Sequence, residues 1–246
     1  MYGYIPSQLL LFKTNLFMSG LKRSLITSVT QKSPITPALL LRLYTCIDVN
    51  NSFHLCMWAA MLFLFFTFVR KSNILPVSSS KFDKVKQVCC RDVVCYRDKM
   101  FVNLNWSKTV QFAQRKVCIP VSAIPGSTLC PVQAYRKLQT LVPCSYNMSP
   151  FCYYDDKGCI TTLSYTVFVV QLRQWLQQVG IKNCSQFCTH SFRRGGATFA
   201  FQCGVNPTLI KAQGDWASDC YLKYVSLSLQ DKLLTTSSMA NVIRNL

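Results

Sequence analysis

Two stretches near the C-terminus decide the fold: residues 189–198, which read THSFRRGGAT, and residues 214–225, which read GDWASDCYLKYV. The first stretch predicts a helix that carries His190 in its first turn and Arg193 one turn further on, so that the two side chains lie on one face. The pair Gly195-Gly196 lacks the spacing of a phosphate-binding loop. We expect these glycines to let the helix approach a neighbouring element closely.

The residues of both stretches resemble the signature of the tyrosine recombinase, or phage integrase-like, family. That signature is His-x-x-Arg at a helix start, then a His or Trp, then a nucleophilic Tyr, and here it falls on His190, Arg193, Trp216 and Tyr224. The string GDWASDCYLKY is most similar to recombinases of eukaryotic mobile elements, the DIRS-like and Crypton-like groups. Tyr224 has the family's spacing from Trp216, whereas we expect Tyr221 to be a packing residue.

The resemblance extends upstream and covers about residues 20–230. Arg70 follows a long apolar run, where the family's first catalytic Arg ends an apolar helix, but Asn73 stands where Glu or Asp is usual. Lys108, in the string WSKTVQF, matches the family's catalytic Lys in a β-hairpin turn. The string QKSPITPALL at 31–40 looks like the beginning of the family's catalytic domain.

The resemblance implies a division of chemical labour among these residues. Tyr224 would be the nucleophile, although a phenol has a pKa near 10 and needs help to lose its proton. Arg70 and Arg193 would hold the phosphate, because guanidinium groups stay charged and match phosphate oxygens with forked donors. Their positive charge would stabilise the pentacoordinate transition state. Arg194 is expected to contact the DNA backbone instead.

The other three residues would move protons or support the phosphate. His190 is the candidate base, since its reference pKa lies near 6.5. Lys108 would be the general acid for the leaving 5′-oxygen, and Trp216 would pack beneath the phosphate and donate its indole N–H. The product would be a 3′-phosphotyrosine. The resemblance implies no metal, ATP or redox cofactor.

Composition independently indicates a polyanionic partner. The 246 residues include 27 Lys and Arg against 9 acids, all of them Asp, so that the net charge is 27 − 9 = +18. Half of the residues are hydrophobic, which excludes a disordered chain. The sequence pI near 9.5 favours nucleic acid first and an anionic membrane second. We expect double-stranded DNA as the partner, with self-association on it.

The cysteines and the longest apolar run indicate an intracellular protein. The sequence does not begin with a signal-peptide pattern, so the fourteen cysteines are expected to be reduced and the location to be nuclear. Cys89, Cys90 and Cys95 lack a second ligand pair at zinc spacing, and the chain has only two histidines, His54 and His190. The run 55–69 is fifteen residues long, against about 20 for a membrane span, and predicts a buried helix.

The pattern of the whole chain predicts an α+β, mostly α-helical protein with a small antiparallel sheet. The resemblance implies that this is the tyrosine recombinase catalytic-domain fold. Thr36 and Pro37 predict the start of the first helix, and Ser52 is expected to cap the second. The expected helices are 37–47, 53–70, 132–141, 164–180, 190–203, 207–213, 218–225 and a C-terminal tail. The expected strands are 93–96, 100–106 and 114–120, and 142–159 is expected to be a loop.

Two domains are expected. Residues 1–33 would be a remnant of the N-terminal clamp domain with its linker, and residues 34–246 the catalytic domain. The predicted function is DNA strand cleavage and rejoining in the recombination or integration of a mobile element. Asn73 and the shortness of the clamp leave open a DNA-binding protein that has lost catalysis. Type IB topoisomerase activity and binding to a membrane surface are further alternatives.

Overall fold

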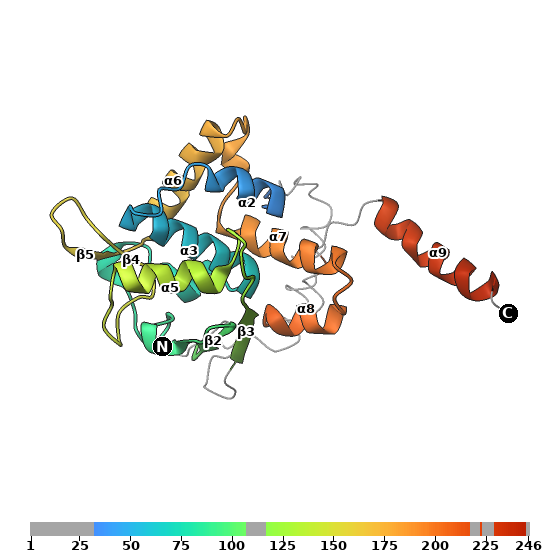
Figure 1. The fold of residues 1–246 in the computed structure, drawn as a ribbon, viewed down its shortest axis with the longest axis horizontal. Coiled ribbons are helices and arrows are strands. Elements are labelled where there is room, and N and C mark those ends of the chain that lie inside the picture. Colours follow the sequence, from blue (N-terminus) through green and yellow to red (C-terminus); the bar gives the residue numbers. More distant parts are fainter. Residues whose placement is uncertain (1–31, 107–116, 217–221, 223–228, 245–246) are drawn as a thin grey trace, which may run out of the picture. The chain divides into compact units, whose positions relative to one another are not determined.

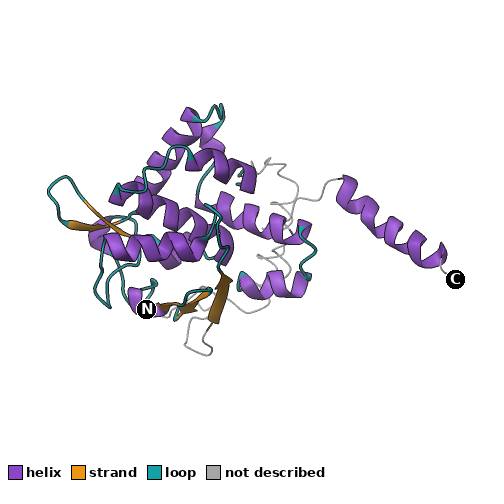
Figure 2. Ribbon diagram, viewed as in Figure 1, coloured by secondary structure: helices purple, strands orange, loops and turns teal. Residues whose placement is uncertain are grey.

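The computed structural model describes residues 32–106, 117–216, 222 and 229–244. These residues all belong to the unit Lys32–Leu246, into which the chain divides after Gln31. Helices predominate and the strands are short (Figure 2), as predicted. The prediction that residues 1–33 form a clamp remnant falls almost entirely outside the described residues.

The centre of the unit is α3 (Ser52–Thr67), whose side chains from Leu55 to Phe65 are all buried. A helix that is apolar all round must be covered on every side, and α5 (Pro131–Leu141) and α7 (Thr189–Gln202) pack against it (Figure 1). Among the described residues, no helix combines the length and the apolar character that crossing a membrane requires.

Both ends of α3 differ in detail from the prediction. Asn51 rather than Ser52 caps the helix, because the Asn51 carboxamide oxygen accepts from the His54 N–H. The Ser52 hydroxyl instead accepts from the Tyr154 N–H. At the other end the helix stops at Thr67 and not at residue 70, because Phe68 adopts the left-handed conformation with φ 54°.

Two further helices begin directly after polar residues that cap them. Thr36 caps α2 (Pro37–Tyr44) through its side chain, with Pro37 in the first turn, and Ser164 caps α6 (Tyr165–Gln178). The list is completed by α4 (Lys71–Ile74), α8 (Pro207–Gln213), α9 (Leu229–Arg244) and the 3₁₀ turns η1 (Ser79–Lys81), η2 (Cys90–Asp92) and η3 (Cys184–Gln186). The short helix predicted at 218–225 lies outside the described residues except for Leu222.

The predicted three-stranded antiparallel sheet is present in the order β1-β2-β3, formed by β1 (Val93–Cys95), β2 (Lys99–Leu104) and β3 (Val117–Ser122). In the central strand, Val102 pairs with Val93 on one side and with Ile119 on the other. Alternate residues Met100, Val102 and Leu104 are buried, so that one face of this strand belongs to the core. The connection at 107–116 lies outside the described residues.

The prediction of a loop over 142–159 is wrong in its second half. Residues 152–154 form β4 (Cys152–Tyr154), which pairs antiparallel with β5 (Ile160–Thr162). The Asp155 carboxylate accepts from the Lys157 and Cys159 N–H groups and closes the turn between them. Such strands of three residues are too short to produce a periodic pattern in the sequence.

The Gly195-Gly196 pair allows the close approach that the sequence predicts. A Cβ atom on Gly196 would lie 2.0 Å from the carbonyl oxygen of Phe65 in α3. One on Gly195 would lie 1.7 Å from the carbonyl oxygen of Ile35. Backbone atoms cannot rotate away as side chains can, so only glycine allows α7 to pack this closely on both segments.

We expect Gly196→Ala to lower the free energy of unfolding in urea by about 3 kcal/mol or more, because the added methyl group overlaps backbone. Gly126→Ala is the control. Gly126 has a φ of 76° with open space around it, so its replacement should cost only the left-handed strain of about 1–2 kcal/mol. Equal losses for the two variants would contradict the packing role of Gly196.

Candidate active site

Arg193 is the most deeply buried of the candidate residues, with 2% of its surface exposed. From α7, its Nη1 donates to the Phe68 carbonyl oxygen, and its Nη2 donates to the Gly214 carbonyl oxygen at 2.8 Å. Phe68 and Gly214 are the C-cap residues of α3 and α8. A guanidinium is well suited to this position, because helix C-termini carry partial negative charge and carbonyls without partners inside the helix.

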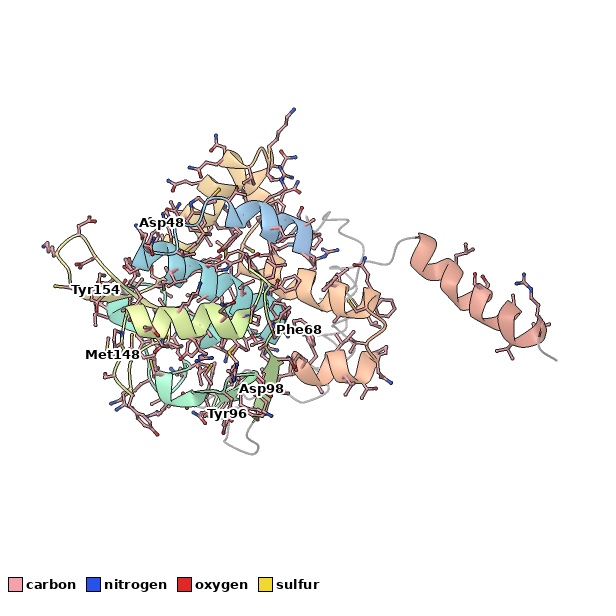
Figure 3. All side chains as sticks on the ribbon, in the orientation of Figure 1. Asp48, Phe68, Tyr96, Asp98, Met148 and Tyr154 are labelled. Carbon is pink, nitrogen blue, oxygen red and sulfur yellow. The ribbon has the colours of Figure 1, made fainter. Side chains whose placement is uncertain are left out.

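Trp216 lies against the face of the same guanidinium. The Cζ atom of Arg193 is 4.0 Å from the Trp216 ring centroid, a cation–π contact. The indole is 5% exposed and packs with Phe68, Ala197 and Ile210 in a small apolar cluster. Figure 3 labels Phe68, which contributes its carbonyl to Arg193 and its ring to Trp216. Arg193 is therefore held by polar contacts at its edge and by an aromatic ring on its face.

Arg70 comes to this place from a different part of the chain. It does not end α3, as the sequence suggested, but lies two residues beyond Phe68 as the N-cap of α4. Arg70 and Arg193 line one small cavity, together with Asn73, Gln213 and other residues. The fold thus brings two arginines that are distant in sequence to the same cavity.

His190 is an exposed residue in the otherwise buried first turn of α7, close to both arginines. Packing that removes water from part of the imidazole lowers the pKa of His190, and the positive charges of Arg193, Lys71 and Arg70 lower it further. Each of these causes disfavours the imidazolium form. The neutral ring that results has one nitrogen able to accept a proton.

Four of the six predicted site residues are therefore neighbours: Arg70, His190, Arg193 and Trp216. The other two, Lys108 and Tyr224, lie outside the described residues, as does Tyr221. Arg194 does not join the cavity, since its Nη1 donates to the Lys32 carbonyl oxygen at 3.2 Å. This geometry agrees with the choice of Arg193 over Arg194.

Sequence reasoning did not identify two residues that brace the site. Gln213 donates from Nε2 to the carbonyl oxygens of Phe66, at 3.0 Å, and Pro120, at 3.3 Å, and so links the ends of α8 and α3 to β3. Lys71 adds a cation beside His190, and its Nζ lies 3.6 Å from the Tyr165 ring centroid. Only the position of Lys71 next to Arg70 in the sequence could have indicated it.

Metal ligands are not assembled in the part of the chain that the structure describes, where no group of three or more His, Cys, Asp or Glu residues could hold an ion. The cysteines described there are all free thiols. His54, the second histidine, has a structural environment: its Nδ1 accepts from the Asp48 N–H at 3.2 Å and its ring meets Trp175 edge to face.

Comparison with known proteins identifies solved structures that have a similar fold. No protein-family model and no curated protein matches the chain. Among solved structures, XerH site-specific recombinase bound to its difH substrate matches with a TM-score of 0.56 and 13% identity, covering 82% of this chain and 53% of that one. XerA recombinase matches with a TM-score of 0.53 and 15% identity, covering 85% of this chain and 64% of that one.

A third match is the Tn1549 transposon integrase in complex with transposon right-end DNA, with a TM-score of 0.56 and 13% identity, covering 89% of this chain and 70% of that one. The fold is therefore that of tyrosine recombinase catalytic domains, as the sequence resemblance implied. The chain spans about half the length of the XerH recombinase that it matches.

Replacing Arg193 should destabilise the protein, because two helix C-terminal carbonyls would lose a charged donor. We expect Arg193→Lys and Arg193→Ala each to lower the free energy of unfolding in urea by about 3 kcal/mol, since hydrogen bonds to charged groups contribute about 1.5–3 kcal/mol each. The neighbouring Arg194→Ala should cost about 1 kcal/mol or less. A loss at Arg193 no larger than at Arg194 would contradict the bridging role.

The position of His190 predicts a low titration midpoint. NMR titration of its ring protons should give a midpoint below the usual value of about 6.5, and the two histidines can be told apart with His190→Gln. Arg70→Ala should raise the midpoint, because it removes a positive charge that disfavours imidazolium, whereas Lys182→Ala should leave it unchanged. A midpoint at or above 6.5 that does not respond to Arg70→Ala would contradict the arrangement.

Proposed function

We propose that this protein breaks and rejoins strands of double-stranded DNA through a 3′-phosphotyrosine intermediate. The observation that carries the proposal is the convergence of Arg70 and Arg193 on one small cavity beside His190. Two guanidinium charges that both act on His190, in a protein with net charge +18, suit a phosphodiester group. The fold, shared with recombinases solved on DNA, supports the same function.

In this reaction the phenolic oxygen of Tyr224 attacks the scissile phosphorus. The neutral imidazole of His190 takes up the phenol proton, directly or through a water molecule. Arg70 and Arg193 stabilise the additional negative charge on the non-bridging oxygens in the transition state. The P–O bond to the 5′-oxygen breaks as Lys108 gives that oxygen a proton. A 5′-hydroxyl then attacks the phosphotyrosine, restores the DNA strand and releases Tyr224.

The rigidity of Arg193 suits this role. Its charge is fixed by the carbonyls of Phe68 and Gly214 and by the Trp216 ring before any DNA binds. A preorganised charge stabilises a transition state without the cost of reorienting during the reaction. Trp216 also fixes the path of the chain immediately before the segment that contains Tyr224.

The wider setting of the reaction is also part of the proposal. The excess of cations would line the duplex on both sides of the cleaved phosphate and make binding strongly salt-dependent. Recombination requires two DNA sites, so we propose self-association on DNA. Action on a mobile element of the DIRS-like or Crypton-like kind, in the nucleus, is the setting that the sequence resemblance favours.

Replacing Tyr224 tests the chemistry directly. On a nicked suicide duplex, from which the short fragment that carries the new 5′-hydroxyl diffuses away after cleavage, wild type should accumulate a covalent protein–DNA adduct. Tyr224→Phe should form no adduct, because it lacks the nucleophilic oxygen, whereas Tyr221→Phe should form it at the wild-type rate. Denaturing gel electrophoresis measures the adduct.

The controls separate the proposal from its alternative. DNA binding by both variants, measured by fluorescence anisotropy, should match wild type. The alternative, a DNA-binding protein without catalysis, is favoured by the neutral Asn73 at a position where the resembled family has an acid. It predicts salt-dependent binding with no adduct from wild type, and that outcome would refute strand cleavage.

A further inference from the structure

Asn73 is a buried amide residue of α4 beside the candidate active site. It is 2% exposed, follows Arg70 by three residues and lines the cavity that Arg70 and Arg193 share. Its backbone N–H donates to the Arg70 carbonyl oxygen at 3.0 Å, and its own carbonyl accepts from the Val88 N–H at 2.7 Å. The backbone of Asn73 is thus fixed on both sides.

The side chain of Asn73 makes a bond that only a donor can make. Its Nδ2 donates to the Trp106 carbonyl oxygen at 2.8 Å. A carbonyl oxygen is an acceptor, and an ionised carboxylate is an acceptor only. An ionised aspartate or glutamate at this position would therefore place a carboxylate oxygen against the Trp106 carbonyl oxygen, two acceptors with no hydrogen between them, in a buried place. Only a protonated acid could make this hydrogen bond.

Trp106 lies where the chain leaves the sheet. Strand β2 ends at Leu104, and Lys108 follows Trp106 by two residues in the sequence. A second amide holds the neighbouring residue to a different element: Asn105 Nδ2 donates to Asp92 Oδ1 in η2 at 2.8 Å. The Asn73 bond ties this part of the chain to α4 and Arg70, whereas the Asn105 bond ties it to η2.

We propose that Asn73 is a positioning residue whose amide sets the exit of β2 in register with Arg70, so that strand cleavage requires a hydrogen-bond donor at this position. The proposal rests on the strand cleavage proposed above. The sequence suggested that Asn73 replaces a required acid and so reflects a loss of activity. Under this proposal the neutral side chain of Asn73 is instead needed for activity. Restoring an acid should impair the protein and not improve it.

The test compares Asn73→Asp, Asn73→Ala and Asn105→Ala with wild type in single-turnover cleavage of the nicked suicide duplex, with protein saturating and at a temperature where circular dichroism shows all variants folded. At pH 8 we expect Asn73→Asp and Asn73→Ala to be slower than wild type by about tenfold or more, the loss of about one buried hydrogen bond. Asn105→Ala is the matched control and should stay within about twofold of wild type.

The pH profile distinguishes positioning from a merely structural effect. Burial and the Trp106 carbonyl raise the pKa of a carboxyl at this position above the usual value of about 3.9, whereas the charges of Arg70 and Arg193, which line the same cavity, lower it. The proposal requires that the first effect prevails. Once protonated, the carboxyl can donate to the Trp106 carbonyl as the amide does. The rate of Asn73→Asp relative to Asn73→Ala should therefore rise as the pH falls from 8 to 5. Both variants keep His190, so Asn73→Ala measured over the same pH range supplies the baseline for this comparison.

Stability gives a second measurement that does not depend on cleavage. In Asn73→Asp the folded-state pKa of the new carboxyl lies above its unfolded value, so its stabilising contribution is present at low pH and is lost as the pH rises. Its free energy of unfolding relative to Asn73→Ala should thus be higher at pH 5 than at pH 8. If Asn73→Asp does not fold at pH 8, recovery of the fold at pH 5 gives the same answer.

Each contrary outcome has a definite meaning. Faster cleavage by Asn73→Asp than by wild type would show that the position needs an acid and would overturn the proposal. Equal losses of cleavage rate in Asn73→Ala and Asn105→Ala would show that the Asn73 amide only supports β2 in a general way, and would overturn the proposal. A ratio of the Asn73→Asp rate to the Asn73→Ala rate that does not change with pH would overturn it for the same reason. Wild type that binds DNA without forming an adduct would instead refute strand cleavage itself, and with it this role of Asn73.

Discussion

The charge of Arg193 is the constraint on which the arrangement of the site depends. A guanidinium that is 2% exposed would be very costly without partners. Here its partners are the carbonyls that end α3 and α8 and the face of Trp216. Because one cation satisfies two helix ends at once, α3, α7 and α8 cannot shift independently, and the segments that carry Arg70 and Trp216 are fixed with them.

Two unusual backbone features become intelligible through this contact. Phe68 adopts a left-handed conformation, which is uncommon for a bulky residue, and it does so where α3 stops and its carbonyl meets Arg193. Gly195 and Gly196 lie two and three residues after Arg193 in α7 and bring this helix against the backbone of Ile35 and Phe65. The close packing of α7 and the burial of Arg193 are therefore two aspects of one contact.

Burial also distinguishes the two arginines chemically. Arg193 is fixed inside the protein, whereas Arg70 is only partly buried at the start of α4. Partial burial lowers the pKa of His190, and the positive field that Lys71 forms with the two arginines lowers it further. Such a field favours a phosphate group and a neutral imidazole together, the combination that phosphotyrosine chemistry requires.

The sequence by itself determined the order of most elements and indicated the candidate site residues. Capping by Thr36 and Ser164, the alternation of β2 and the spacing of His190 and Arg193 are local properties, and local hydrogen bonding and periodicity decide them. The hairpin of β4 and β5 was not predicted, because strands of three residues are too short to show a periodic pattern of apolar residues.

Only the tertiary structure decided what those residues contact. It showed that Arg193 donates to carbonyl oxygens at the ends of two helices. It also showed that Asn73 donates to the Trp106 carbonyl oxygen, whereas the sequence suggested only that an expected acid is absent there. The bonds of Arg193 to Phe68 and of Asn73 to Trp106 join residues 125 and 33 positions apart. Partners so distant in sequence leave no local pattern, because a side chain's donors are matched to acceptors only once the chain has folded.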